Sequence, residues 1–339
     1  MNLHDIISML ILFILGYTIT RVITPIVMKF NWLIGLRGVD VHKKSKPILP
    51  ESGGLAILIS STILLPLIIL VRPEYTTYTL VTISVTVFAG LVGYLDDLKR
   101  LDAFSKTLLT VIAIAPILVL YVFKPYPYLP FIGRTRLTII YTILLLFAVA
   151  VPSNAFNMLD VYNGVLPSTS ILMFSTLFIS SILTYHVGIA DLFPLYALTL
   201  IIGVLLGYYP YNRYPARVFN GDVGSFFLGA YYGVIAVLGR LEVIAITAML
   251  PCIMNSFHIL SSIGGLKEKS QIKCRPVIVD YSRELLIANK SRYAPITLAN
   301  LLLVRGPLRE TEIVTCYILL SIVSSILAII VAVLTYLYT

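Results

Sequence analysis

Two adjacent aspartates, Asp96 and Asp97, stand at the end of a long apolar run, in the segment Gly-Leu-Val-Gly-Tyr-Leu-Asp-Asp-Leu-Lys-Arg that ends at Arg100. Carboxylates beside the hydrocarbon of a membrane are costly unless they bind a cation or a charged substrate. A pair of this kind can hold a divalent metal ion or position an anionic substrate through that metal. We therefore predict that Asp96 and Asp97 belong to a functional site.

Four other polar segments interrupt the apolar chain, at residues 40–54, 154–164, 220–225 and 264–280. Two of them carry residues that suit phosphate and metal chemistry. Asp222 lies between Gly221 and Gly224, and glycines of this kind let a backbone approach a phosphate closely. Asn157 supplies a neutral carbonyl oxygen, which together with a carboxylate matches the oxygen ligands that Mg²⁺ prefers.

The elements that must position these segments are membrane helices. Hydrophobic residues make up 58% of the 339 residues and charged residues only 12%, and the mean hydropathy is +0.95. This composition excludes an ordinary soluble domain. Stretches long enough to cross a bilayer as helices recur along the chain, at residues 6–28, 53–71, 78–95, 105–123, 137–151, 165–185, 190–209, 222–238, 241–262 and 314–336. We predict an all-α polytopic membrane protein with about ten transmembrane helices, in which 137–151 is the shortest.

The basic residues predict the orientation of these helices. Eighteen Lys and Arg residues fall in the loops at one end of the predicted spans, and five fall in the loops at the other end. Cytoplasmic loops carry the excess of Lys and Arg, so we expect a multi-pass protein of the cell membrane with both termini outside. All five polar segments then lie at the cytoplasmic face, where they can form one site. The formal net charge of +9 suits anionic lipid head groups or a phosphate-bearing substrate, and we expect no nucleic-acid partner.

Four motifs in this order carry a resemblance to a known family. They are Lys-Pro-x-x-Pro-Glu-Ser-Gly-Gly at 46–54, Gly-x-x-Asp-Asp at 93–97, Asn-x-x-Asn-x-x-x-x-x-Asn-Gly at 154–164 and Gly-Asp-x-Gly-Ser at 221–225. Together they resemble the polyprenyl-phosphate N-acetylhexosamine-1-phosphate transferases, which include phospho-N-acetylmuramoyl-pentapeptide translocase and dolichyl-phosphate GlcNAc-1-phosphate transferase. The segment 296–303, followed by Gly-Pro, is similar to the eukaryotic and archaeal branch in particular.

The resemblance implies transfer of a sugar phosphate from a UDP-N-acetylhexosamine to a polyprenyl or dolichyl phosphate, with UMP as the second product, as the first membrane step of glycan assembly. Bacterial muramoyl-pentapeptide transferases share a His-x-His-His run in the last large loop, and this chain has no histidine after His258. This difference argues against a peptide-bearing donor and favours UDP-GlcNAc. The resemblance also implies one domain over 1–339, with a large loop at 263–313 that contributes to the donor site, and it implies that homodimers can form.

Joining two phosphates is limited mainly by charge repulsion and positioning, so the resemblance implies Mg²⁺, with Mn²⁺ as an alternative. It implies that Asn157 and Asp222 bind the metal and that Asp96, Asp97 and Asp222 are catalytic. For Asp96 the role is to position the lipid phosphate or finally to deprotonate it. The substrate-binding residues that the resemblance implies are Glu51, Arg100, Asn154, Asn163, Lys273 and Arg275.

Other interpretations of these residues are open from the sequence alone. Asp222 could be a solvated helix N-cap, the asparagines could hold helices together by hydrogen bonds, and Asp96 and Asp97 could pair with Lys99 and Arg100 at the surface. Two other functions are also open. An intramembrane, Mg²⁺-dependent prenyltransferase would need a second cluster of spaced carboxylates, and a secondary transporter would place ionisable residues at the middle of its spans.

Overall fold

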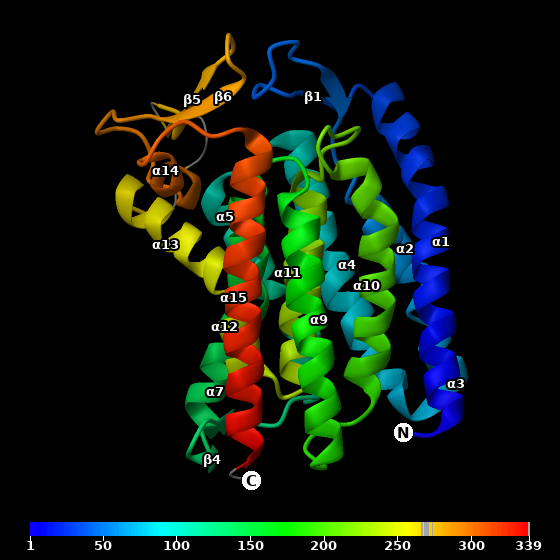
Figure 1. Cartoon of the computed structure of the whole chain (residues 1–339). Helices are drawn as coiled ribbons and strands as arrows, with labels where there is room; N and C mark the ends of the chain where they lie inside the picture. Colours follow the sequence, from blue (N-terminus) through cyan, green and yellow to red (C-terminus); the bar gives the residue numbers. More distant parts are fainter. Residues whose placement is uncertain (266, 268–270, 273, 338–339) are drawn as a thin grey trace.

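The computed structural model describes residues 1–265, 267, 271–272 and 274–337 as a bundle of helices with three short β-hairpins (Figure 1). The helices in the first part of the chain are α1 (Leu3–Leu33), α2 (Leu55–Leu64), α3 (Leu67–Val71), the 3-10 turn η1 (Pro73–Tyr75), α4 (Thr76–Lys99), α5 (Ala103–Ile112), α6 (Ala115–Val119), α7 (Thr138–Leu145) and α8 (Phe147–Leu159). Those that follow are α9 (Val165–His186), α10 (Phe193–Asn212), α11 (Gly221–Leu238), α12 (Glu242–Ala248), α13 (Leu250–Ile263), α14 (Leu298–Leu303) and α15 (Glu310–Leu337).

All ten predicted spans are helical over most of their length, and the prediction of a mostly helical polytopic membrane protein is confirmed. Among the described residues, seven segments are long and apolar enough to cross a membrane, and an eighth is the pair α12 and α13, which is bent by 67°. The remaining two expected spans are the shorter apolar segments Leu55–Val71 and Ala103–Val119. A proline lies at or beside each of these three breaks, at Pro66, Pro116 and Pro251. Proline interrupts a helix because it cannot donate the backbone hydrogen bond that a helix interior requires.

The hairpins are the part of the fold that the sequence did not predict. Strands β1 (Arg37–Val39) and β2 (Ile48–Pro50) pair antiparallel, with Gly38 opposite Leu49. Strands β3 (Tyr128–Leu129) with β4 (Gly133–Arg134), and β5 (Val277–Asp280) with β6 (Leu285–Ala288), form two more antiparallel pairs. Each pair gives backbone hydrogen-bond partners to a loop that would otherwise have none.

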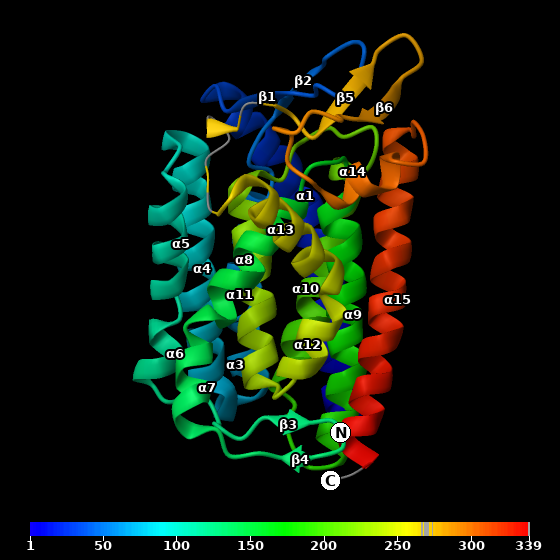
Figure 2. The same cartoon turned by 90° about the vertical axis from the view of Figure 1, so that its left-hand side faces the viewer.

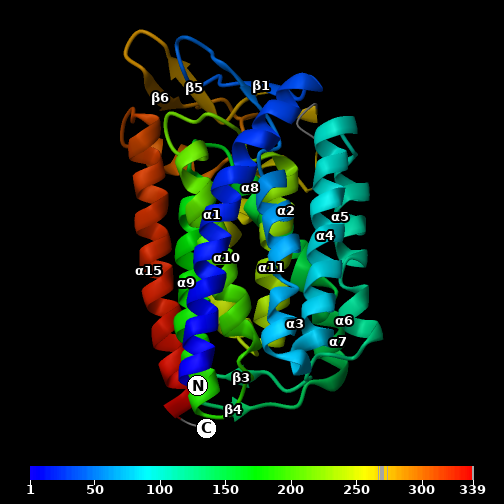
Figure 3. The same cartoon turned by 90° about the vertical axis from the view of Figure 1, so that its right-hand side faces the viewer.

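Helix α11 forms the centre of the bundle. Every residue from Val223 to Val237 is buried, whereas α1 and α15 leave most of their apolar surface exposed. Figures 1 and 3 show α11 between α4, α8, α9 and α10, with α1 and α15 at the outside. An exposed apolar face on an outer helix is expected where lipid replaces water as the solvent. The start of α11, where Asp222 lies, is thus placed by neighbouring helices on several sides.

Small residues allow these helices to pack closely, and the glycines of the seventh and eighth expected spans are among them. A Cβ atom on Gly233 of α11 would lie 1.9 Å from the Ala148 carbonyl oxygen of α8, and one on Gly203 of α10 would lie 2.4 Å from the Phe13 carbonyl oxygen of α1. Glycines at such crossings let two backbones approach directly. They are therefore packing residues.

Both termini lie at one end of the bundle (Figure 1). The hairpins β1–β2 and β5–β6 and the short helix α14 cover the opposite end (Figures 2 and 3). The loops that carry the polar segments start or end there, because α4 ends at Lys99, α8 ends at Leu159 and α11 begins at Gly221. The fold thus brings the described residues of the five polar segments to the end opposite the termini.

Candidate active site

Asp97 holds the first turn of α11 in place. Its Oδ1 accepts a hydrogen bond of 2.8 Å from the Asp222 backbone N–H, and its Oδ2 accepts one of 2.6 Å from the Ser52 hydroxyl and one of 3.3 Å from the Val223 N–H. The first N–H groups of a helix have no partner within the helix, and a carboxylate there is also favoured by the helix dipole. Asp97 therefore joins the end of α4, the start of α11 and the loop before α2.

Asp96 and Asp222 share one cation. The Lys106 ammonium of α5 donates to Asp96 Oδ2 at 3.0 Å and to Asp222 Oδ2 at 3.2 Å. Asp96 also accepts a bond of 2.6 Å from the Leu101 N–H, which orients its other oxygen. The side chains of Lys106, Asp96 and Asp222 are only 21%, 12% and 15% exposed, so their charges are little screened by water.

The sequence analysis counted Lys106 only as a residue of one membrane face. A lysine at the second position of the expected span 105–123 is itself costly in lipid, and this is the signal by which Lys106 could have been found. Its helix α5 begins at the N-cap Asp102, whose side chain accepts from the Ser105 N–H. The cap orients α5 so that Lys106 faces the ends of α4 and α11.

Glycines permit the close approach on which this arrangement depends. A Cβ on Gly93 of α4 would lie 2.3 Å from the Asp222 carbonyl oxygen, and one on Gly54 would lie 2.2 Å from the Gly224 Cα. Gly221 has a φ of +71°, which few other residues adopt, and a Cβ there would meet Asp97 Oδ2 at 2.4 Å. The Gly-rich motifs of the sequence thus allow three chain segments to meet at Asp222.

The asparagines of α8 complete this side of the site. Asn157 donates from Nδ2 to the Ser225 hydroxyl at 3.0 Å, and that hydroxyl donates to the Asp222 carbonyl at 3.2 Å. This contact uses the amide nitrogen of Asn157 and leaves its oxygen as the atom that can bind a cation. Asn154 lies one turn earlier and donates to the Ala150 carbonyl at 2.8 Å and to the Thr110 hydroxyl at 3.5 Å.

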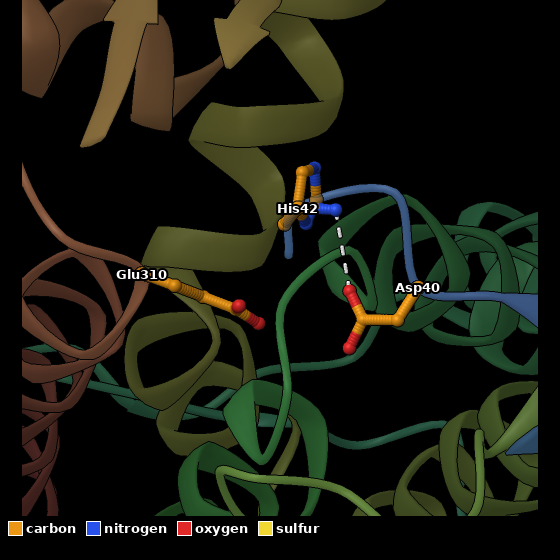
Figure 4. Close-up of side chains that lie close together, drawn as sticks. All are labelled: Asp40, His42 and Glu310. Atoms are coloured by element: carbon orange, nitrogen blue, oxygen red, sulfur yellow. Dashed lines mark hydrogen bonds between the residues drawn. The ribbon is translucent and has the colours of Figure 1, made fainter. Parts of the chain in front are cut away.

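A second polar group surrounds Asn163. Its side chain donates to Asp40 Oδ2 at 3.0 Å, and its backbone N–H donates to Glu310 Oε1 at 2.8 Å. Lys43 bridges the same two carboxylates, by a contact with Asp40 and one of 3.0 Å to Glu310. Figure 4 shows Asp40 and Glu310 facing His42, and candidate ligand atoms of these three residues lie within 4.8 Å of one another. Because Lys43 already offsets the two carboxylates, we interpret this group as the support that fixes Asn163.

His42 belongs to this second group and is held as a neutral ring. It stacks on Tyr162 with ring centroids 5.1 Å apart and donates its backbone N–H to Asp40 Oδ1 at 3.2 Å. Burial lowers the pKa of His42 below its usual value of 6.5, against the opposing effect of the Glu310 and Asp40 charges. Lys43 and Arg275 add to the lowering. The sequence analysis did not single out Glu310, since it begins the last helix, far along the chain from the motifs.

The remaining residues to place are Asp160, which was not predicted as a site residue, and the predicted residues Glu51, Arg100, Arg275 and Lys273. Asp160, beside Asn163 in the same loop, accepts a bond of 2.7 Å from Asn220, which precedes Asp222 by two residues. Glu51 is held through its backbone, as its carbonyl accepts from the Asn31 amide at 2.7 Å and its N–H donates to the Leu36 carbonyl.

The predicted residues Arg100 and Arg275 are exposed, and Arg100 adopts a left-handed conformation at the C-cap of α4. Lys273 lies outside the described residues.

The structure therefore brings Asp96, Asp97, Asp222 and Asn157 together, with Asn154 beside them. It does not pair Asp96 or Asp97 with Lys99 or Arg100, since the cation that meets Asp96 is Lys106. The residue at the N-cap of α11 is Asn220, so Asp222 does not hold that position. Two carboxylates around a single lysine tolerate a positive charge between them, and the amide oxygen of Asn157 belongs to the same polar group through Ser225.

Comparisons with known proteins identify the family of the chain. The family model of glycosyl transferase family 4 matches residues 79–240, which run from α4 to the end of α11. A protein of Saccharolobus solfataricus provisionally named UDP-N-acetylglucosamine–dolichyl-phosphate N-acetylglucosaminephosphotransferase is 30% identical over 69% of this chain and 72% of its own. A phospho-N-acetylmuramoyl-pentapeptide-transferase of Anoxybacillus flavithermus is 30% identical over 68% and 75%. A provisionally named glycosyltransferase of Methanocaldococcus jannaschii is 26% identical over 97% and 98%.

Proposed function

Because the chain belongs to glycosyl transferase family 4, we propose that it transfers an N-acetylhexosamine 1-phosphate from a UDP-sugar to a polyprenyl phosphate and releases UMP. The observation that carries this proposal is the convergence of Asp96, Asp222 and Asn157 from three helices at one end of a membrane bundle. A lipid acceptor and a water-soluble donor can meet only at such an end. The acceptor is a polyprenyl or dolichyl phosphate.

We further propose UDP-GlcNAc as the donor. The relative from Saccharolobus solfataricus carries UDP-N-acetylglucosamine and dolichyl phosphate in its name. The relative from Anoxybacillus flavithermus is named for a muramoyl pentapeptide, but this chain has no histidine after His258 with which to form the His-x-His-His run of that branch. Two observations thus support a GlcNAc donor: the name of the relative from Saccharolobus solfataricus and the lack of the His-x-His-His run in the last loop of this chain.

The reaction needs little proton transfer. The second pKa of a phosphate monoester is about 6, so the lipid phosphate is mostly a dianion at neutral pH. Its oxygen attacks the donor phosphorus that bears the sugar, a new P–O bond forms, and the bond to UMP breaks. Lys106 can then turn from the carboxylates to a phosphate oxygen, and Asp97 keeps the first turn of α11 in place during the reaction.

Asp222 and Asn157 would hold a divalent cation, Mg²⁺ or Mn²⁺, with Asp96 beside it. The residues fit this role because hard cations take carboxylate and amide oxygens, and because Lys106 already occupies a place for positive charge between Asp96 and Asp222. When bound, such a cation offsets the negative charge that develops on the phosphates. Asp96 positions the lipid phosphate.

We place this site at the cytoplasmic face. Support comes from the loops at the same end, which carry eighteen Lys and Arg residues against five at the other end. The donor would then come from the cytoplasm, and the large loop at 263–313, with β5, β6 and α14, would cover it. No observation on the described residues specifically favours a prenyltransferase or a transporter. The second acidic group, Asp40 with Glu310, is already paired with Lys43.

The test is an assay of the purified chain in detergent with polyprenyl phosphate, a panel of UDP-sugars and Mg²⁺. We expect UMP release and a lipid diphosphate sugar, fastest with UDP-GlcNAc and stopped by EDTA. Asp222→Asn should lower the rate by a factor of about 10² or more. Asp191→Asn, an exposed change at the other end of the bundle, is the matched control. UMP release without lipid, or lipid-independent uptake of a substrate into vesicles, would contradict transfer.

A further inference from the structure

A mostly apolar pocket that also contains two cations lies at the same end of the bundle, on the outer side of α1. An open pocket of about 630 Å³ is formed there by the last turns of α1, by Pro50 of β2, by Tyr211 of α10 and by Arg217 of the loop before α11. Figure 3 shows α1 in front of α10 at this edge of the bundle. None of the residues of the candidate active site lines this pocket.

The pocket lies at the level of the lipid head groups. Helix α1 has 31 residues and is therefore about 46 Å long, whereas the hydrocarbon of a bilayer is about 30 Å thick. Its N-terminal turn lies at the end with the termini (Figure 3), and its predicted span ends at residue 28, so roughly its last five residues project beyond the hydrocarbon at the other end. Lys29 and Trp32, which line the pocket, belong to this projecting part, and Met28 lies at its boundary.

Two cations of the pocket face outward without a protein partner. Lys29 and Arg217 are exposed, and neither forms a hydrogen bond or ion pair through its side chain with any part of the chain that the structure describes. Among the residues that the structure describes, the cations that form ion pairs are Lys43, Arg72 and Lys106. An anion that binds Lys29 and Arg217 would thus break no existing contact.

Aromatic rings border the two cations. Arg37 lies over the Trp32 ring at 4.0 Å and donates to the Trp32 carbonyl at 2.8 Å, so that ring is held in place. Tyr211 donates its hydroxyl to the Arg21 carbonyl at 2.9 Å. Trp and Tyr at the ends of membrane helices favour the interface with the head groups. Pro25, Met28 and Pro50 supply apolar surface beside them, which suits the upper part of an acyl chain.

From this combination we propose that the pocket binds an anionic phospholipid, with its phosphate between Lys29 and Arg217 and its acyl chains along α1. The positive charge of the pocket, its position at the level of the lipid head groups and its apolar wall all match this one class of ligand. The lipid would contact β2 directly. The Pro50 carbonyl accepts a bond of 3.0 Å from the Phe219 N–H, three residues before Asp222, so the lipid would brace a loop of the active site. The binding itself does not depend on the transferase activity.

The single tryptophan of the chain, Trp32, permits a direct test. The full chain is reconstituted in phosphatidylcholine vesicles that contain a small fraction of either brominated phosphatidylglycerol or brominated phosphatidylcholine, since bromine quenches a tryptophan that it touches. We expect stronger quenching by the anionic lipid. Each Lys or Arg near an anionic lipid contributes a factor of about five in affinity, so two give a preference of up to about thirty-fold.

Three variants make the test specific. Lys29→Gln/Arg217→Gln should reduce the preference several-fold, with Arg37 beside Trp32 still in place, and Lys29→Arg/Arg217→Lys should keep it. Lys44→Gln/Arg305→Gln, which removes two exposed cations from the same end of the bundle, should keep it as well. Equal quenching by the two lipids in the unmodified protein, or an unchanged preference in the double Gln variant, would overturn the proposal.

Two competitors separate the anionic phospholipid from other phosphates. Inorganic phosphate should leave the quenching unchanged, because it lacks the acyl chains that contact Met28 and Pro50. Polyprenyl phosphate should not displace the brominated lipid at concentrations that saturate the transferase. Displacement by either compound would assign the pocket to a free anion or to the acceptor lipid and would overturn the proposal.

Discussion

Three aspartates of the candidate active site lie close together but have different partners. Asp97 accepts three hydrogen bonds, from Ser52 and from two backbone N–H groups of α11, so its oxygens are already committed. Asp96 and Asp222 both accept a hydrogen bond from the lysine of α5. We infer that Asp97 is a positioning residue and that Asp96 and Asp222 face the substrates.

Replacing Lys106 by Met tests its role. Loss of the ammonium leaves Asp96 and Asp222 without their shared cation and removes a donor for the phosphates. We expect the kcat to fall by a factor of about 10²–10³ while the protein still elutes as a folded species. Lys99→Met, an exposed change at the end of α4, should keep most of the activity. A Lys106→Met protein with unchanged kcat would show that the lysine only balances charge.

The half-buried histidine of the second polar group, His42, predicts a dependence of stability on pH. The pKa of His42 is lowered in the folded chain, so the unfolded chain takes up its proton first as the pH falls. Stability is therefore lost below about pH 6.5, the usual pKa of histidine. We expect the melting temperature of the unmodified protein to fall relative to that of His42→Gln between pH 8 and pH 5.5. A parallel pH dependence of the two proteins would contradict this.

At the scale of elements, the site depends on how closely α4, α8 and α11 approach one another. Gly93 of α4 lies against the Asp222 backbone, and Gly229 of α11 lies against Ser153 of α8. These contacts set the relative height of the helices and therefore decide that the acidic ends of α4 and α11 face the amides of α8. The glycines are as necessary to the site as its charged residues.

Gly93→Ala tests this dependence. Its Cβ would lie 2.3 Å from the Asp222 carbonyl oxygen, so α11 must move by the distance that a methyl group requires. We expect the free energy of unfolding to fall by about 1–3 kcal/mol, together with a loss of activity larger than the loss of folded protein. The control is Ser84→Ala on the exposed side of α4, for which neither quantity should change.

The whole molecule separates the polar groups of its two ends. At the end with the termini, Arg72 donates to Asp5 at 2.5 Å and Tyr196 donates to the same carboxylate at 2.7 Å. Asp5 is only 1% exposed, so its charge depends on these donors. This group joins α1, α10 and the segment before α4 at the opposite end from the site (Figure 1). Its role is to hold the bundle together.

The Arg72→Gln variant should therefore affect stability and not catalysis. Removing the guanidinium leaves Asp5 as a buried charge with one donor fewer, and we expect a loss of about 1–3 kcal/mol. The double variant Asp5→Asn/Arg72→Gln should lose less, because no charge then remains unpaired. The kcat of folded protein should stay unchanged in both. A fall in kcat at full folded fraction would show that the two ends are coupled.

The sequence alone determined the class of the protein and the helical segments, because hydropathy sets membrane helices, and it predicted most of the candidate site residues, because polar residues at the ends of such helices are costly. It also determined the family, since four motifs occur in order. Only the tertiary structure decided the partners: Lys106 between Asp96 and Asp222, Asp97 on the first turn of α11, and Glu310 beside Asn163. These contacts join residues up to 147 positions apart, and no local pattern encodes them. They form because the packed bundle must at once bring helices together at glycines, give hydrogen-bond partners to the free groups at helix ends and pair its buried charges.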